Sequence, residues 1–270
     1  MFRQIIACLD GSSFAEKILP LARGLTASTG GRLTLLRIVQ DAAELAAEEQ
    51  YLRECARQYN AELRFRVSTD PADAIVTELE RVPGGIAALT THGRSAWMEA
   101  VLGSIAFRVI RAGNRPVIIF RSLGEAREAP QRIRNVAVAL DGSRFAERIL
   151  PHAIKAAQSL SARLLLIQSL PINPAPVPMI EPKSSDILES SYLHRKADEI
   201  KTTSGIDVDW EVLHGDAGDA ICRYLVDSRE TLLAMTTHAR PPLQRVALGS
   251  VAGECVRNSG VPLLLYWSHS

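Results

Sequence analysis

Two segments of this chain each occur twice, and this repeat limits the fold more than any other feature. D-G-S-S-F-A-E-K-I-L-P at 10–20 returns as D-G-S-R-F-A-E-R-I-L-P at 141–151. T-T-H-G-R-S-A-W-M-E-A-V-L-G-S at 90–104 returns as T-T-H-A-R-P-P-L-Q-R-V-A-L-G-S at 236–250. A unit of about 130 residues can bury its own core. We therefore expect one domain at 1–122, a polar linker at 123–132 and a second domain at 133–270.

Within each copy, short apolar runs alternate with stretches of helical spacing. The expected strands of the first copy are 4–9, 33–39, 63–67, 86–89 and 116–120, and the expected helices are 13–28, 41–59, 72–81 and 104–112. Strands at 135–140, 164–169, 208–213, 232–235 and 261–266 repeat the order. Such alternation predicts two doubly wound α/β domains, each an open sheet of five parallel strands flanked by helices.

Local signals place the ends of the first helix and one insertion. Ser13 and Glu16 have the spacing of a capping box, and Gly30 with Gly31 should end the helix. The distance between copies is 131 residues at Asp10 and Asp141 but 146 at the Gly-Ser pairs. The second copy therefore carries about fifteen extra residues, which we place in a proline-rich loop at 171–185 that could lie over the second site.

Composition narrows the function classes. Lysine and arginine number 31 against 30 acidic residues, so there is no net field to attract nucleic acid or an anionic membrane. The longest uncharged run, 164–180, contains four prolines, which would break a membrane-spanning helix. The four cysteines are widely spaced and suggest neither a zinc site nor a disulfide framework. With no secretion signal visible, we expect a soluble, cytoplasmic protein.

The segment 90–104 predicts a strand, a glycine-containing loop and the start of a helix. Backbone N–H groups in such a loop, together with the positive end of the helix dipole, commonly hold phosphates. The Walker A pattern and G-x-G-x-x-G are both absent from the sequence. No nucleophile with a paired base recurs in both copies, so no catalytic residue is assigned. The histidines outside the repeat show no metal-ligand spacing.

Each half resembles a universal stress protein domain, and the whole chain resembles a tandem member of that family, with an adenine-nucleotide alpha-hydrolase-like fold. Nucleotide-binding members carry G-x-x-G, nine residues, then G-S or G-T. In the first copy Thr90 replaces the first glycine, whereas Gly93 and the pair Gly103-Ser104 match. In the second copy Thr236 and Ala239 replace both early glycines, and Gly249-Ser250 remain. An alanine where φ is positive costs on the order of 1 kcal/mol, so the second copy is the weaker match.

The resemblance implies ATP, with Mg²⁺, as the ligand and assigns roles to residues. Asp10 would contact the adenosine end, Leu9 and Ile38 would flank the base, and the threonine hydroxyls could hydrogen-bond the nucleotide. The ribose and phosphates would lie along His92 and Gly93, with Gly103, Ser104 and Ile105 at the phosphates. Arg94 follows His92 and could reach a phosphate, or it could simply be solvated. The equivalents in the second copy are Asp141, Ser169, Thr236, His238, Gly249, Ser250 and Val251. Ser169 is polar where an apolar base contact is expected.

Each assignment has a plainer alternative. Asp10 and Asp141 could serve only as turn formers, Ser104 and Ser250 only as helix caps, and His92 and His238 as ordinary loop histidines. At the level of function, the leading hypothesis is an ATP-binding stress-response regulator. The alternatives are a nucleotide-free scaffold for an unknown protein partner and, more weakly, an ATP-using enzyme.

The edge strands of the two copies predict how the domains associate. Domains of this family commonly pair through the last strand, here 116–120 and 261–265, because its backbone groups would otherwise be exposed. We expect the two copies to pair in this way within one chain, as a compact pseudo-dimer. A further association into a homodimer through edge strands is also an expectation.

Overall fold

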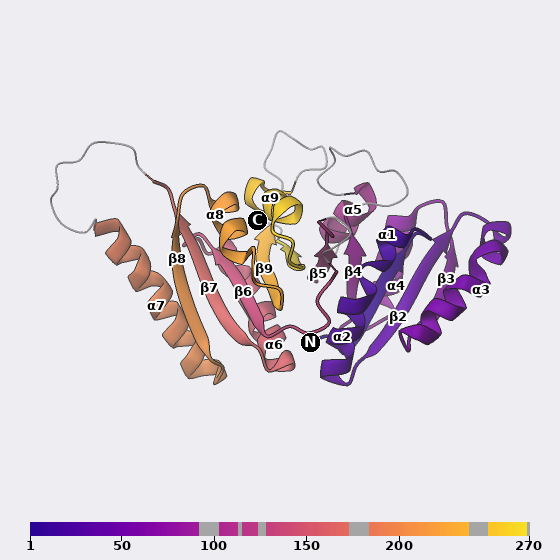
Figure 1. The fold of residues 1–270 in the computed structure, drawn as a ribbon, viewed down its shortest axis with the longest axis horizontal. Coiled ribbons are helices and arrows are strands. Elements are labelled where there is room, and N and C mark those ends of the chain that lie inside the picture. The colour runs from indigo at the N-terminus through magenta and orange to yellow at the C-terminus, as the bar shows by residue number, and fades with distance from the viewer. Residues whose placement is uncertain (92–102, 113–114, 124–127, 173–183, 238–247, 269–270) are drawn as a thin grey trace.

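The computed structural model describes residues 1–91, 103–112, 115–123, 128–172, 184–237 and 248–268 (Figure 1). The first half contains, in chain order, β1 (Gln4–Leu9), α1 (Ser13–Glu16), α2 (Leu19–Thr29), β2 (Arg32–Val39), α3 (Ala42–Gln58), β3 (Glu62–Val67), α4 (Pro71–Glu80), β4 (Ile86–Thr90), α5 (Ser104–Ala112) and β5 (Val117–Phe120).

The second half repeats this order with one change. It contains β6 (Asn135–Leu140), the 3₁₀ helix η1 (Ala146–Ile149), α6 (Leu150–Leu160), β7 (Arg163–Leu170), α7 (Ser184–Ser204), β8 (Val208–His214), α8 (Ala217–Leu225), β9 (Thr231–Thr237), α9 (Ser250–Asn258) and β10 (Leu263–Trp267). The change is η1, which stands where the first half has α1. Most of the proline-rich insertion, 173–183, lies outside the described residues.

The ten strands of the described residues form one continuous sheet, in the order β3-β2-β1-β4-β5-β10-β9-β6-β7-β8. Strands within each half are parallel, as predicted, and β5 pairs antiparallel with β10, with Ile118 opposite Leu264. The predicted pairing of the two copies within one chain is thus confirmed. Because β5 and β10 each have a neighbour on both sides, the outer edges of the sheet are β3 and β8, and a homodimer through edge strands stays an expectation.

A layer of helices covers each face of the sheet. Alternate strand residues point to opposite faces, so Leu35 belongs to the core beneath α2, α3, α6 and α7, whereas Leu36 belongs to the core beneath α4, α5, α8 and α9. Both cores run through both halves. In Figure 1, α5 and α9 lie near the junction of the halves. There the rings of Phe107 and Trp267 pack edge to face, with their centroids 6.0 Å apart.

The helix predicted at 13–28 is in fact two helices. Lys17 and Ile18 separate α1 from α2, and Pro20 occupies the first turn of α2. Proline has no N–H to donate to the carbonyl four residues earlier, and its ring would collide with that carbonyl, so one helix cannot run through this point. Pro151 sits in the same way at the start of α6. The predicted end is confirmed, because Gly30 takes a left-handed conformation with φ of 62°.

Candidate functional site

The order of strands places the candidate residues of the first half at one edge of the sheet. β1 lies between β2 and β4, and the chain passes from one side of β1 to the other at this point. In open α/β sheets, ligands bind outside the carboxyl ends of the strands where the order reverses. Asp10 follows the carboxyl end of β1, and Thr90 ends β4. The two residues therefore lie at the position where this fold receives ligands.

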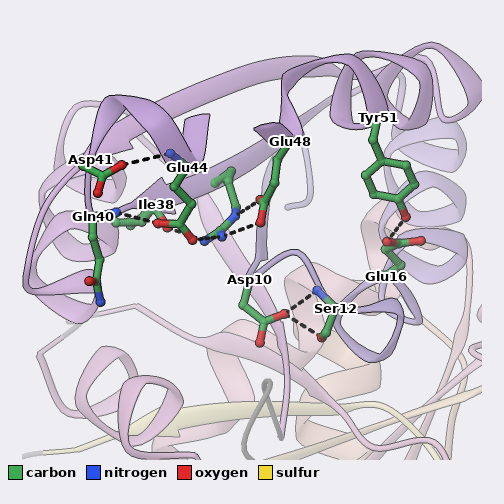
Figure 2. Close-up of polar contacts among 10 residues, drawn as sticks. Asp10, Ser12, Glu16, Ile38, Gln40, Asp41, Glu44, Glu48 and Tyr51 are labelled. Atoms are coloured by element: carbon green, nitrogen blue, oxygen red, sulfur yellow. Dashed lines mark hydrogen bonds and ion pairs between the residues drawn. The ribbon is translucent and has the colours of Figure 1, made fainter. Parts of the chain in front are cut away.

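Asp10 shapes the turn that leaves β1. Its carboxylate accepts hydrogen bonds from the N–H of Ser12 at 3.0 Å and from the hydroxyl of Ser12 at 2.6 Å (Figure 2). Gly11 between them has a φ of 79°. The hydroxyl of Ser12 in turn accepts from the N–H of Ala15 at 3.1 Å, so Ser12 is the cap of α1. The cap is therefore Ser12, and the capping box predicted from Ser13 and Glu16 is wrong, because the residue three positions after Ser12 is Ala15. The turn-forming role of Asp10 is present.

Gly103 joins β4 to the start of α5. Its N–H donates to the carbonyl of Thr91 at 2.7 Å, and a Cβ on Gly103 would stand 3.1 Å from that carbonyl oxygen. The first bond along the helix runs from the N–H of Phe107 to the carbonyl of Gly103 at 3.0 Å. The N–H groups of Ser104, Ile105 and the next residue precede this bond and point out of the helix end. The Gly103 N–H thus donates to Thr91, whereas Ser104 and Ile105 are exposed, and the predicted phosphate contacts stay a prediction.

The predicted base contacts lie on opposite faces of the sheet. Leu9 is 6% exposed and packs in the core on the α2 and α3 side. Ile38 is 8% exposed and packs in the core on the α4 and α5 side. The structure does not bring their side chains together. His92, Gly93, Arg94 and His238 lie outside the described residues.

A buried arginine at the end of β2 was missed by the sequence reasoning. Arg37 is 5% exposed, and its guanidinium contacts Glu44 and Glu48 of α3, at 2.6 Å for the shortest contact with each. The two glutamates are labelled in Figure 2. It also donates to the carbonyl of Ile38. Burial opposes the charge of Arg37, but the two carboxylates outweigh it and raise the pKa of the guanidinium. The available signal was a single charge in the apolar run 33–39, followed by glutamates four residues apart.

The second half keeps the turn, and the hydroxyls of two of its other candidate residues form internal hydrogen bonds. The carboxylate of Asp141 accepts from the N–H of Ser143 at 2.9 Å. The hydroxyl of Thr236 donates to the carbonyl of Ala146 at 3.2 Å, and the hydroxyl of Ser169 donates to the carbonyl of Gly215 at 3.1 Å. Both hydroxyls thus bond to the protein.

The start of α9 resembles that of α5. Among the described residues, however, the Gly249 N–H does not repeat the hydrogen bond that the Gly103 N–H makes to Thr91. Gly249 is the cap residue of α9, and its carbonyl accepts from the N–H of Gly253 at 2.8 Å. Ser250 is exposed, and Val251 is half-buried. Backbone donors at this helix end have the same orientation as those of α5.

The described part of the chain also bears on other kinds of site. There, no group of three or more histidine, cysteine or acidic side chains is placed to hold a metal ion. None of the helices in that part combines the length and the apolar character needed to cross a bilayer. A groove of about 690 Å³ lies at the amino ends of β7 and β8, beside Trp210 and Tyr224, and so at the opposite edge from Asp141.

Comparisons with known proteins agree with one another. Residues 132–266, half of the chain, match the Universal stress protein family. The chain is 23% identical to Universal stress protein Slr1230 of Synechocystis sp. over 303 aligned positions, which cover 98% of this chain and 99% of that protein. A universal stress protein of Archaeoglobus fulgidus, 20% identical, superposes with a TM-score of 0.73 over 99% of both chains.

One further structure shows how widely the architecture is used. The cytoplasmic domain of a prokaryotic cation chloride cotransporter superposes with a TM-score of 0.55 at 13% identity, over 97% of this chain and 94% of that one. Because one fold serves different functions, the function has to be argued from the site.

Proposed function

The chain belongs to the universal stress protein family, and on that premise we propose that it binds ATP with Mg²⁺, chiefly in its first half, as a cytoplasmic, nucleotide-dependent regulator of a stress response. One observation carries the proposal. The turn at Asp10, the end of β4 and the start of α5 converge at the carboxyl edge of the sheet, where its strand order reverses.

The donors at this edge fit an anionic group. The N–H groups of Ser104 and Ile105 and the hydroxyl of Ser104 lie at the exposed start of a nine-residue helix, whose dipole favours negative charge. Gly103 supports them because its N–H is tied to Thr91, which fixes the direction in which α5 begins. A side chain on Gly103 would press on the Thr91 carbonyl and shift the helix end. These residues would hold the phosphates, and Asp10 would face the adenosine end.

The second half is the weaker candidate because its hydroxyls already have acceptors. Ser169 and Thr236 bond to the carbonyls of Gly215 and Ala146. The sequence also places Ala239 where nucleotide-binding relatives have glycine. We therefore propose one nucleotide per chain and a regulatory rather than a catalytic role.

The test is native mass spectrometry of the purified chain before and after addition of millimolar Mg-ATP. We expect one ATP per chain, lost in Gly103→Val and kept in Gly249→Val, which changes the equivalent residue of the second half. Ser104→Ala should weaken binding without the steric change, and circular dichroism should verify that each variant is folded.

Other counts would overturn the proposal in distinct ways. Two ATP molecules per chain would contradict the assignment of binding chiefly to the first half. If no ATP is bound at millimolar Mg-ATP, the proposal of ATP binding is wrong, and the scaffold hypothesis is favoured. If the chain releases phosphate from ATP steadily and Asp10→Ala abolishes this release, the protein is an enzyme rather than a regulator.

A further inference from the structure

Two cysteines face each other between α8 and α9, on the side of the sheet that also carries α4 and α5. The helices approach closely here, since a Cβ on Gly218 of α8 would stand 2.9 Å from the Cβ of Glu254 on α9. One turn further along α8, the thiol of Cys222 donates to the carbonyl of Glu254 at 3.9 Å. Cys255 is the next residue on α9, so the Cys222 thiol contacts the backbone directly before it.

The two thiols differ in exposure and in ease of ionisation. Cys222 is 9% exposed, whereas Cys255 is fully buried. The neighbouring Cys255 thiol lowers the pKa of Cys222, although burial opposes this. The Cys222 thiol, together with burial, raises the pKa of Cys255. Because the thiolate is the reactive form, Cys222 is the member of the pair that reacts first.

The first half shows that the fold does not need thiols at these positions. With the spacing of 146 residues that relates α5 to α9, Cys222 corresponds to Val76 and Cys255 to Val109. Val109 is fully buried, as Cys255 is. Valine and cysteine are of similar size, so packing alone is satisfied by either. Both members of the pair are cysteine in the second half and both are valine in the first.

We propose that Cys222 and Cys255 are a redox pair that a hydroperoxide converts into a reversible disulfide between α8 and α9. The Cys222 thiolate attacks the peroxide oxygen, the O–O bond breaks, and, for hydrogen peroxide, the released hydroxide is protonated to water. The Cys222 sulfenic acid is then attacked by the sulfur of Cys255, which forms the S–S bond and expels a second water. In sum, two thiols and one hydrogen peroxide give one disulfide and two waters.

The other two cysteines provide an internal comparison. Burial raises the pKa of Cys8 to about 12, and burial with the nearby Glu16 raises that of Cys55 to about 11. Both lie in the first half, in β1 and α3. Thiols with raised pKa values carry little thiolate at neutral pH and react slowly with peroxide. Selective oxidation should therefore reach Cys222 before Cys8 or Cys55.

The experiment treats the full chain with one equivalent of hydrogen peroxide, blocks remaining thiols with N-ethylmaleimide in denaturant, and maps the tryptic peptides. Cys222 falls in the peptide 202–223 and Cys255 in the peptide 246–257, so their disulfide joins two separate peptides. We expect this linked pair of peptides, and we expect N-ethylmaleimide to block the other two of the four cysteines. Dithiothreitol should remove the link. In Cys255→Val, dimedone should instead trap a sulfenic acid at Cys222.

The controls separate the proposal from general oxidation. The double variant Cys222→Val, Cys255→Val copies the first half and should fold, keep its two remaining thiols and form no linked peptide. If all four cysteines of the wild-type chain can still be alkylated after peroxide treatment, or if Cys8 or Cys55 is oxidised first, the proposal is wrong. It is also wrong if dimedone labels nothing at Cys222. None of these outcomes depends on whether ATP binds.

Discussion

Two adjacent serines at the end of β1 have different roles. Ser12 caps α1 through the N–H of Ala15 and also bonds to Asp10, whereas Ser13 is exposed in the first turn. Replacing a cap serine with alanine leaves a helix N–H without its acceptor, which typically costs about 1 kcal/mol. We expect Ser12→Ala to lower the free energy of unfolding by about that amount, measured by urea denaturation.

Ser13→Ala is the matched control, since it removes a hydroxyl one residue away and should change the free energy of unfolding by less than about 0.5 kcal/mol. Equal losses in the two variants would contradict the assignment of the cap to Ser12. Ser143→Ala tests the same turn in the second half, where the Ser143 hydroxyl accepts from the N–H of Ala146 at 3.1 Å.

At this scale, the sequence predicts what depends on near neighbours. Asp10 and Ser12 are two residues apart, so the repeated D-G-S pattern was sufficient to indicate a turn. Arg37 depends on Glu44 and Glu48, which come from a helix whose placement the sequence does not give. The opposite directions of Leu9 and Ile38 follow from the register of β1 with β2, in which Leu9 lies opposite Arg37. A resemblance to a family indicates which residues correspond to those of its members, but it does not give the register between these strands.

Among the elements, α4 and β3 are joined by a buried carboxylate. Glu78 of α4 has a side chain only 1% exposed and contacts Arg64 and Arg66 of β3, each at 2.7 Å. Burial alone would raise the pKa of Glu78, but the hydrogen bonds from the two arginines outweigh it, and the pKa lies below its ordinary value. The charges also protect β3, an outer edge of the sheet, from pairing with another chain.

The lowered pKa gives a prediction for the effect of pH. A carboxylate whose pKa is lower in the folded state stabilises the fold above its unfolded pKa of 4.5, and this contribution is lost as the pH falls through the folded value. At pH 7 we expect Glu78→Gln to lower the free energy of unfolding by about 1–2 kcal/mol, because the partly exposed arginines are screened by solvent.

The difference between the wild-type protein and Glu78→Gln should shrink as the pH is lowered below about 4.5, when unfolding is followed by circular dichroism at several pH values. Glu80→Gln, at an exposed position of the same helix, is the control and should show no such change. A difference between wild type and Glu78→Gln that stays constant from pH 7 to pH 3 would contradict the role of the ion pairs.

Strands were easier to predict than helix boundaries. Buried parallel strands read as short apolar runs, and every predicted strand lies at its observed place to within a few residues. The break between α1 and α2 was missed because helical spacing continues across Pro20, although the ring excludes a continuous helix.

In the whole molecule, the two halves are joined by more than the β5–β10 pair. The terminal ammonium group of Met1 donates to the hydroxyl of Ser159 on α6 at 2.6 Å, and α2 packs beside α6. The union of the sheets was implied by the family resemblance, since domains of this family commonly pair through the last strand, and the exposed backbone groups of that strand supported it. The contacts between helices and the segment before β6 depend on side-chain shape and had no signal in the sequence.

Gly24 provides a test of this wider junction. It lies inside α2, where alanine would normally stabilise a helix by about 0.5–1 kcal/mol. However, a Cβ at this position would stand 1.7 Å from the backbone carbonyl oxygen of Gln131, in the segment that leads into the second half. The segment has to move to admit even one methyl group, so we expect Gly24→Ala to lower the free energy of unfolding by about 1–3 kcal/mol in urea denaturation.

Ser28→Ala is the control on the same helix, since Ser28 is exposed and should change stability by about 0.5 kcal/mol or less. X-ray scattering of Gly24→Ala adds a second readout, because displacement of the segment at Gln131 loosens one contact between the halves while β5 and β10 stay paired. A small increase in the radius of gyration without separation into two bodies is the expected result. A Gly24→Ala variant more stable than wild type would show that helix propensity prevails and that the segment is not seated on α2.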